Sequence, residues 1–199
     1  MSFRDIHFNW LEEIIVPSID LLYGTPKDRD LIQRDANERT VVANICCKAN
    51  AILYEKQNIN NDLENLGIDI EYNRNSTYPK RVYEKCGVCP NEGCFIKERK
   101  LRPTVSSPDM IIHQRGSNEN NQVVIEYKKT SSINSQERDA DKAKLIYFTC
   151  QQPFLEHENE NYQYRIGFFI DLDCDKYFVT TYQNTSSDQP RTRLRGVWL

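Results

Sequence analysis

The sequence predicts an α/β domain, in which helical and strand segments follow one another along the chain. Apolar side chains recur at helical spacing over Asp35–Tyr54, which favours an amphipathic helix. Two apolar runs, Met110–His113 and Val123–Tyr127, flank a polar Gly/Asn loop and favour an antiparallel hairpin. A further apolar run, Tyr164–Leu172, is typical of a buried strand.

Length and composition are those of a globular protein with one core. The chain has 199 residues, of which 28% are charged and 39% hydrophobic, so we expect a single domain over residues 1–199. No apolar run is long enough to span a bilayer, and the N-terminus lacks the apolar segment of a signal peptide. We therefore expect a cytoplasmic protein with no membrane partner. The net charge of −3 argues mildly against nucleic-acid binding but does not exclude it, because basic residues can gather on one face.

Three helices and a strand are expected before the hairpin. The first helix covers Ser2–Tyr23, and Pro17 should end or kink it. The second should start at Thr25, because the proline that follows suits the first helical position. After the third helix, Asp35–Tyr54, the alternating segment Ile68–Tyr72 is expected to be a strand.

Three charged residues should meet at one end of the hairpin. Glu126 and Lys128 share a face, because strand side chains alternate with period two. If Arg115 pairs with Gln122 across the loop, Asp109 lies opposite Lys128. A register shifted by two residues preserves this convergence, whereas a shift of one residue breaks it.

Two carboxylates and an ammonium group at one point suit a hard divalent cation. Mg²⁺ takes oxygen ligands, usually one or two carboxylates together with substrate phosphate and water. The cation can lower the pKa of bound water, and a lysine can orient that water or offset charge on the phosphate. This is a chemistry for phosphodiester hydrolysis. The alternative is a solvated hairpin end with an incidental ion pair.

The spacing of these residues resembles a known motif. Pro108-Asp109, sixteen intervening residues and Glu126-Tyr127-Lys128 are similar to the signature of the PD-(D/E)XK nuclease superfamily, which includes many restriction endonucleases. The resemblance implies a restriction-endonuclease-like core with a central mixed β-sheet flanked by helices, over about Asp35–Leu172. It also implies that Asp109 and Glu126 bind Mg²⁺ or Mn²⁺, and that Lys128 is the catalytic lysine. A second Glu-x-Lys, Glu98-Arg99-Lys100, lies in a polar segment without a strand pattern.

Glu38 is a further candidate metal ligand. It lies one turn before Val42, on the apolar stripe of the third helix, and members of the superfamily often carry a glutamate on the first core helix. Alternatively, Asp35 to Glu38 forms a capping box with Glu38 at the third helical position. A second carboxylate, Glu71, faces either the site or solvent.

A cysteine cluster marks an insertion at about residues 73–107. Cys86, Cys89 and Cys94 have a spacing that lets thiolates meet at one metal, which favours structural Zn²⁺. The resemblance also allows an iron–sulfur cluster, and the alternative is a loop of free thiols. The seven cysteines do not indicate a disulfide framework if the protein is cytoplasmic. Candidates for a fourth ligand are Cys46, Cys47, Cys150, Cys174, His113 and His157.

The remaining chain is expected to form a helix, a hairpin and a basic tail. The helix covers Gln136–Gln151, with Ala140 and Ala143 on its apolar stripe, and Tyr177–Tyr182 pairs with the preceding strand. Basic side chains that could contact a phosphate backbone are Lys144, Arg191, Arg193 and Arg195. The alternatives are a solvated helix lysine and a solvated or dimer-contacting tail.

Together these observations predict a Mg²⁺-dependent nuclease that acts on DNA rather than RNA. Cutting both strands of a duplex commonly requires two active sites, so we expect a homodimer. Two other interpretations stay open. One is a catalytically silent nuclease-like binding module, and the other is a zinc-binding adaptor built around the cysteine cluster.

Overall fold

The computed structural model describes residues 8–71, 81–82, 104–105, 107–117, 120–132, 134–149, 162–183 and 191–196. Its helical segments are η1 (Leu11–Ile15), α1 (Val16–Gly24), α2 (Pro26–Gln33), α3 (Glu38–Gln57), η2 (Asn61–Leu63) and α4 (Ser135–Thr149). Its strands are β1 (Gly67–Ile70), β2 (Arg81–Val82), β3 (Thr104–Val105), β4 (Met110–His113), β5 (Asn121–Lys129), β6 (Ile166–Leu172), β7 (Lys176–Tyr182) and β8 (Arg191–Gly196).

The described strands form one large mixed sheet and one small hairpin. The large sheet has the order β1-β4-β5-β6-β7-β8, in which β5 and β6 are parallel and the other neighbours are antiparallel. β2 and β3 pair separately. Helix α4 connects the parallel pair, as parallel strands require a crossover. The expectation of an α/β domain with a mixed sheet flanked by helices is confirmed.

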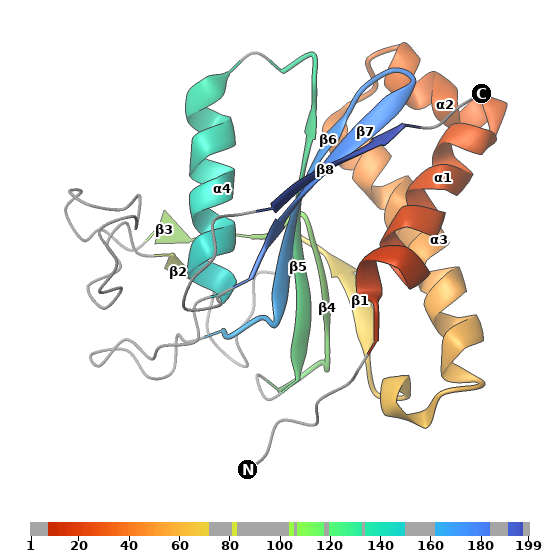
Figure 1. Cartoon of the computed structure of the whole chain (residues 1–199), viewed down its shortest axis with the longest axis vertical. Coiled ribbons are helices and arrows are strands. Elements are labelled where there is room, and N and C mark those ends of the chain that lie inside the picture. The colour runs from red at the N-terminus through yellow and green to blue at the C-terminus, as the bar shows by residue number, and fades with distance from the viewer. Residues whose placement is uncertain are drawn as a thin grey trace.

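The helices cover the two faces of the sheet unequally (Figure 1). Helices α1, α2 and α3 lie on one face, and α4 lies on the other. Strand β5 is buried between them, so its apolar side chains alternate between two cores. Val123, Ile125 and Tyr127 pack with α1 and α3, whereas Val124 packs with the aromatic cluster beneath α4. Even-numbered residues of β5 therefore face α4.

Pro17 does not end the first helix, so of the two predicted effects, an end or a kink, the end is wrong. The chain is helical from Leu11 to Gly24, and Pro17 lies in the first turn of α1. The preceding segment, η1, is π-helical, and Val16 donates its N–H to Leu11 O, five residues earlier. Such a wide turn is one of the ways in which a helix accommodates a proline, which has no N–H to donate.

Helix α3 begins three residues later than expected, at Glu38. Asn37 is its N-cap, and its side-chain oxygen accepts a hydrogen bond of 2.9 Å from Arg39 N. The predicted capping box is therefore wrong, because Glu38 is the first helical residue rather than the third. Capping does not explain the position of Glu38.

The hairpin forms in the predicted place but in a different register. Met110 pairs with Ile125 and Ile112 with Val123, so the pairing is shifted by two residues from the predicted one. An irregularity after Ile112 brings His113 opposite Asn121. Because the shift is an even number from Met110 to Ile112, the side chains of that stretch and of their partners keep their predicted faces.

The second hairpin is confirmed as β6 and β7, and the arginine-rich tail forms strand β8 beside β7. The expected helix 136–151 is present as α4, but its apolar stripe is offset. Ala140 is exposed, whereas Asp141, Leu145 and Phe148 are buried. The predicted stripe was wrong at Ala140, because the polar side chain of Asp141 lies on the buried face, whereas Tyr147, also predicted on the stripe, is buried.

A backbone hydrogen bond joins the two ends of the segment between β1 and β4. Glu71 N donates a hydrogen bond of 3.2 Å to Asp109 O, next to the β1–β4 pair Ile70 and Met110. The predicted cysteine site, Cys86, Cys89 and Cys94, lies outside the described residues. No helix in the described part of the chain is long and apolar enough to cross a membrane.

An ionic cluster at the β1–β4 edge gives a prediction about stability. Asp69 accepts hydrogen bonds from Arg115, at 2.9 and 2.5 Å, and its Oδ2 lies 2.9 Å from Nε2 of the buried His113. Burial opposes ionisation of Asp69, but these partners outweigh it and lower its pKa. A carboxyl whose folded pKa lies below its unfolded value of about 3.9 stabilises the fold above that pH.

We expect Asp69→Asn to lower the free energy of unfolding at pH 7 by about 1–3 kcal/mol, the scale of hydrogen bonds to charged groups. The difference from wild type should shrink as the pH falls below about 4, because Asp69 of the wild type then becomes protonated. Urea unfolding at pH 7 and at low pH measures both values. Asp30→Asn, which removes an exposed ion pair with Arg34, is the control and should change little. Equal stability of Asp69→Asn and wild type at pH 7 would contradict the prediction.

Candidate active site

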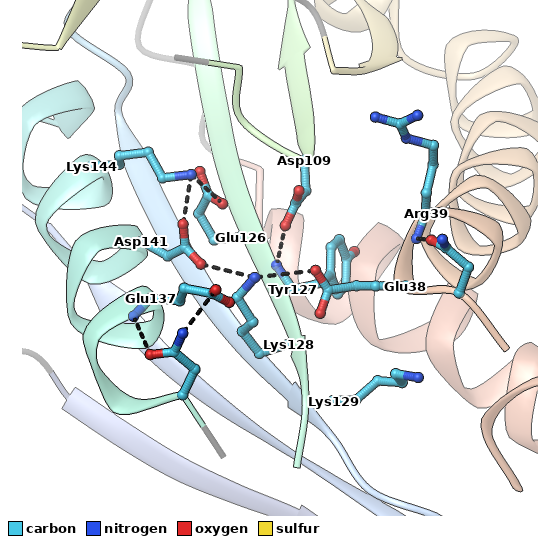
Figure 2. A network of polar contacts seen from close by, with 12 residues as sticks. Glu38, Arg39, Asp109, Glu126, Tyr127, Lys128, Lys129, Glu137, Asp141 and Lys144 are labelled. Carbon is cyan, nitrogen blue, oxygen red and sulfur yellow. Dashed lines mark hydrogen bonds and ion pairs between the residues drawn. The ribbon is translucent and has the colours of Figure 1, made fainter. Parts of the chain in front are cut away.

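Four elements bring charged side chains together at one end of strand β5 (Figure 2). Asp109 immediately precedes β4, and Glu126 and Lys128 lie on β5. Glu38 reaches this group from the first turn of α3, whereas Asp141 and Lys144 reach it from α4. The sequence thus correctly predicted that Asp109, Glu126 and Lys128 lie together, and the structure adds Asp141 to them.

Asp109 is held by the backbone of the neighbouring strand. Its Oδ2 accepts a hydrogen bond of 2.8 Å from Tyr127 N. Burial raises the pKa of Asp109 to about 6, although the Tyr127 N–H and the positive charge of Lys144 act in the opposite direction. The carboxyl group is therefore fixed in place, but its hydrogen bond and the charge of Lys144 do not fully offset the cost of burying its negative charge.

Glu126 is the most deeply buried carboxylate of the site, with 1% of its surface exposed. Its Oε2 lies 3.0 Å from Lys144 Nζ. Its Oε1 is buried and has no hydrogen-bond partner among the described residues. Burial and the negative charge of Asp109 raise the pKa of Glu126 well above its usual value. An unpartnered carboxylate oxygen at full burial is costly, and either a proton or a cation on Oε1 relieves that cost.

Lys128 is held between two carboxylates. Its Nζ lies 3.1 Å from Glu38 Oε1 and 3.1 Å from Asp141 Oδ2. Burial alone would lower the pKa of Lys128, but Asp141 and Glu38 outweigh it and raise the pKa. Lys128 is therefore a fixed cation at neutral pH. The next residue, Lys129, points away from the cluster toward Asp35 and the carbonyl oxygen of Ala36 (Figure 2).

The site carries more negative than positive charge. Its carboxylates are Glu38, Asp109, Glu126 and Asp141, and its ammonium groups are Lys128 and Lys144. Four carboxylates and two ammonium groups leave a formal charge of −2 when all are ionised. One divalent cation neutralises this charge, and the carboxylate oxygens are the ligands that Mg²⁺ prefers. The charge and the oxygen donors therefore suit such a cation, and Asp109 and Glu126 would be its ligands.

The other predicted residues fall in different places. Lys144, expected to contact phosphate or solvent, is bound to Glu126 and Asp141. The Glu71 carboxylate pairs with Arg39 at the surface and makes no ion pair with the cluster among the described residues. The backbone of β8 places Arg191, Arg193 and Arg195 at alternate positions of an edge strand.

Asp141 is the site residue that the sequence did not single out. The available signal was its spacing from Lys144, three residues later, which places both side chains on one face of a helix. A separate group of possible ligands, Asp173, Cys174 and Asp175, lies on the β6–β7 turn. Both Cys174 and Asp175 are exposed, and exposed acidic groups like these are common without a metal. The described carboxylates around Glu126 do not form such a group of three within 4.8 Å, but Glu126 and Asp141 are buried, and a cation there would have Asp109 and Glu126 as its two protein ligands.

We compared the chain with models of protein families, with curated proteins and with solved structures, and found no match. A functional proposal must therefore start from the chemistry of the site. That chemistry combines buried carboxylates, a fixed ammonium group and an excess of negative charge. These features together favour a site for a divalent cation over a simple structural ion pair, in which the charges would balance.

Proposed function

We propose that the protein is a Mg²⁺- or Mn²⁺-dependent nuclease of the PD-(D/E)XK type, with a restriction-endonuclease-like core. The observation that carries this proposal is the buried Glu126 Oε1, which has no partner among the described residues and lies in a site with excess negative charge. Asp109 and Glu126 would hold the cation. When bound, the cation would polarise a phosphoryl oxygen and lower the pKa of a bound water.

The chain's own side chains have separate roles in this proposal. The Tyr127 N–H fixes Asp109, so this ligand is positioned by the backbone of β5. Glu38 and Asp141 hold the ammonium group of Lys128, which would orient the attacking water or offset charge that develops on the phosphate. Because all these groups sit on packed helices and strands, their positions are set before substrate binds.

The order of the elements also supports this assignment. A helix that carries Glu38 precedes the strand pair that carries Asp109 and the Glu-x-Lys, and a helix and a parallel strand follow. That order was expected from the resemblance of the motif. Agreement between motif, element order and site chemistry supports the proposal more than any of them alone.

A cleavage assay on three substrates tests the proposal. We expect cleavage of duplex DNA in Mg²⁺ or Mn²⁺, weaker or no cleavage of single-stranded DNA and RNA, and no cleavage in EDTA. Preferential cleavage of RNA would reject the assignment to DNA while supporting phosphodiester hydrolysis. A folded protein that cleaves none of the three with either cation would instead support the catalytically silent binding module.

A further inference from the structure

Lys144 has no role in the proposed reaction, although it lies within the site. Its side chain is mostly buried, and its Nζ lies 3.0 Å from Glu126 Oε2 and 2.6 Å from Asp141 Oδ1. Among the residues that the structure describes, no other cation lies within ion-pair distance of Glu126. Lys144 therefore provides the positive charge for the most buried carboxylate of the site.

A divalent cation at the unpartnered Glu126 Oε1 would lie next to the Lys144 ammonium group, which binds Oε2 of the same carboxylate. Positive charges that approach the same buried group repel one another strongly, because little water screens them. Lys144 can partly withdraw, however, because Asp141 offers it a second and closer partner on the same helix. Asp141 also binds Lys128, so it can keep both ammonium groups in the site.

The geometry points to a role for Lys144 as a tethered counter-ion of Glu126, an inference that rests on the nuclease function proposed above. In the absence of metal, Lys144 neutralises part of the buried charge and stabilises the fold. When Mg²⁺ or Mn²⁺ binds, Lys144 gives up Glu126 and stays with Asp141. Lys144 thereby sets the cation concentration at which the site fills.

Calorimetric titration of Mn²⁺ alone into Lys144→Met tests this role without nucleic acid or turnover. We expect the variant to bind Mn²⁺ more tightly than wild type, by roughly 10–100-fold, the range over which outer-shell groups tune metal affinity. In EDTA, its melting temperature should be lower than that of wild type, and Mn²⁺ should raise it by more. A lysine with a merely structural role would lower the melting temperature without tightening Mn²⁺ binding.

Lys142→Met is the matched control. Lys142 lies on the same helix, is more exposed, and has Asp139 as its ion-pair partner at 3.8 Å. Its substitution removes the same charge from α4 without touching Glu126, so we expect Mn²⁺ affinity within about twofold of wild type, since distant surface charges are screened. If Lys142→Met gained as much Mn²⁺ affinity as Lys144→Met, the loss of any positive charge from α4 would explain the gain, and the specific role of Lys144 would be overturned.

Lys144→Gln, which keeps a hydrogen-bond donor but no charge, should behave like Lys144→Met. If both variants fold and bind Mn²⁺ no more tightly than wild type, the inference is wrong. If neither folds in EDTA, refolding with Mn²⁺ should restore the structure, and a failure to do so also overturns the inference. If wild type binds Mn²⁺ and Asp109→Asn does not, Lys144 variants that bind Mn²⁺ no more tightly than wild type reject only the counter-ion role of Lys144.

If wild type binds no Mn²⁺, both the counter-ion role of Lys144 and the proposed nuclease function are rejected.

Discussion

Replacement of either proposed metal ligand, as Asp109→Asn or Glu126→Gln, is expected to reduce cleavage by about 10³-fold or more. A metal ion contributes several kcal/mol to stabilising a transition state, and about 4 kcal/mol corresponds to a factor of ~10³ in rate. Both changes keep the shape of the side chain, so the loss should come from charge and coordination. Initial cleavage rates at saturating Mg²⁺, measured beside melting curves, give the result.

The stability of these variants should not fall with their activity. Glu126→Gln removes a buried charge that has one ion-pair partner among the described residues, and Lys144 can still donate to the amide oxygen. We therefore expect a melting temperature in EDTA that is equal to or above that of wild type. Glu71→Gln is the control, because it neutralises a nearby surface carboxylate that pairs only with Arg39 in the described structure. Cleavage by either ligand variant at the wild-type rate would show that the site is wrongly assigned.

Lys128→Met should lower kcat by about 10²–10³-fold, the effect typical of removing one preorganised group that stabilises transition-state charge. It should also destabilise the fold by about 1–3 kcal/mol, because Asp141 and Glu38 lose their shared partner. Lys128→Arg keeps the charge but changes the donor geometry. It should therefore recover stability more than activity.

The adjacent lysine provides a matched control for this prediction. Lys129→Met removes the same side chain one position later on β5, where it binds Asp35 and Ala36 O on the other side of the strand. We expect cleavage at the wild-type rate and a small loss of stability. The comparison needs kcat, KM and melting temperature for both variants. If Lys128→Met and Lys129→Met lost kcat equally, the total positive charge of β5, rather than the position of Lys128, would determine cleavage.

The faces of the hairpin could be predicted from the sequence, but its register could not. Side chains alternate between the two faces of a strand with a period of two, so Glu126 and Lys128 share a face for any conformation of the turn. The register depends on where the loop closes and on the irregularity after Ile112, and neither follows from the residue pattern. The convergence of Asp109, Glu126 and Lys128 was predicted correctly because the error in register was even.

Two other features escaped prediction because tertiary structure overrode a local rule. Pro17 commonly ends helices, yet the π-helical segment before it accommodates the missing N–H. Asp141 was not recognised because a buried helix face is expected to be apolar, and an acidic residue there makes sense only beside Lys128 and Lys144. Sequence rules therefore failed where the fold has polar chemistry in its interior, as is expected of functional sites.

The hydrogen bond that joins the two ends of the segment between β1 and β4 has an evolutionary consequence. Glu71 and Asp109 are joined by a backbone hydrogen bond, so the intervening segment enters and leaves the sheet at adjacent points. Lengthening a loop whose ends are already together costs little, about 0.6 kcal/mol for each doubling. Asp109, meanwhile, is anchored from the opposite side by Tyr127. Descendants of this chain can therefore lengthen, shorten or replace the segment while the strands that carry the candidate site are inherited unchanged, so the two parts are free to diverge at different rates.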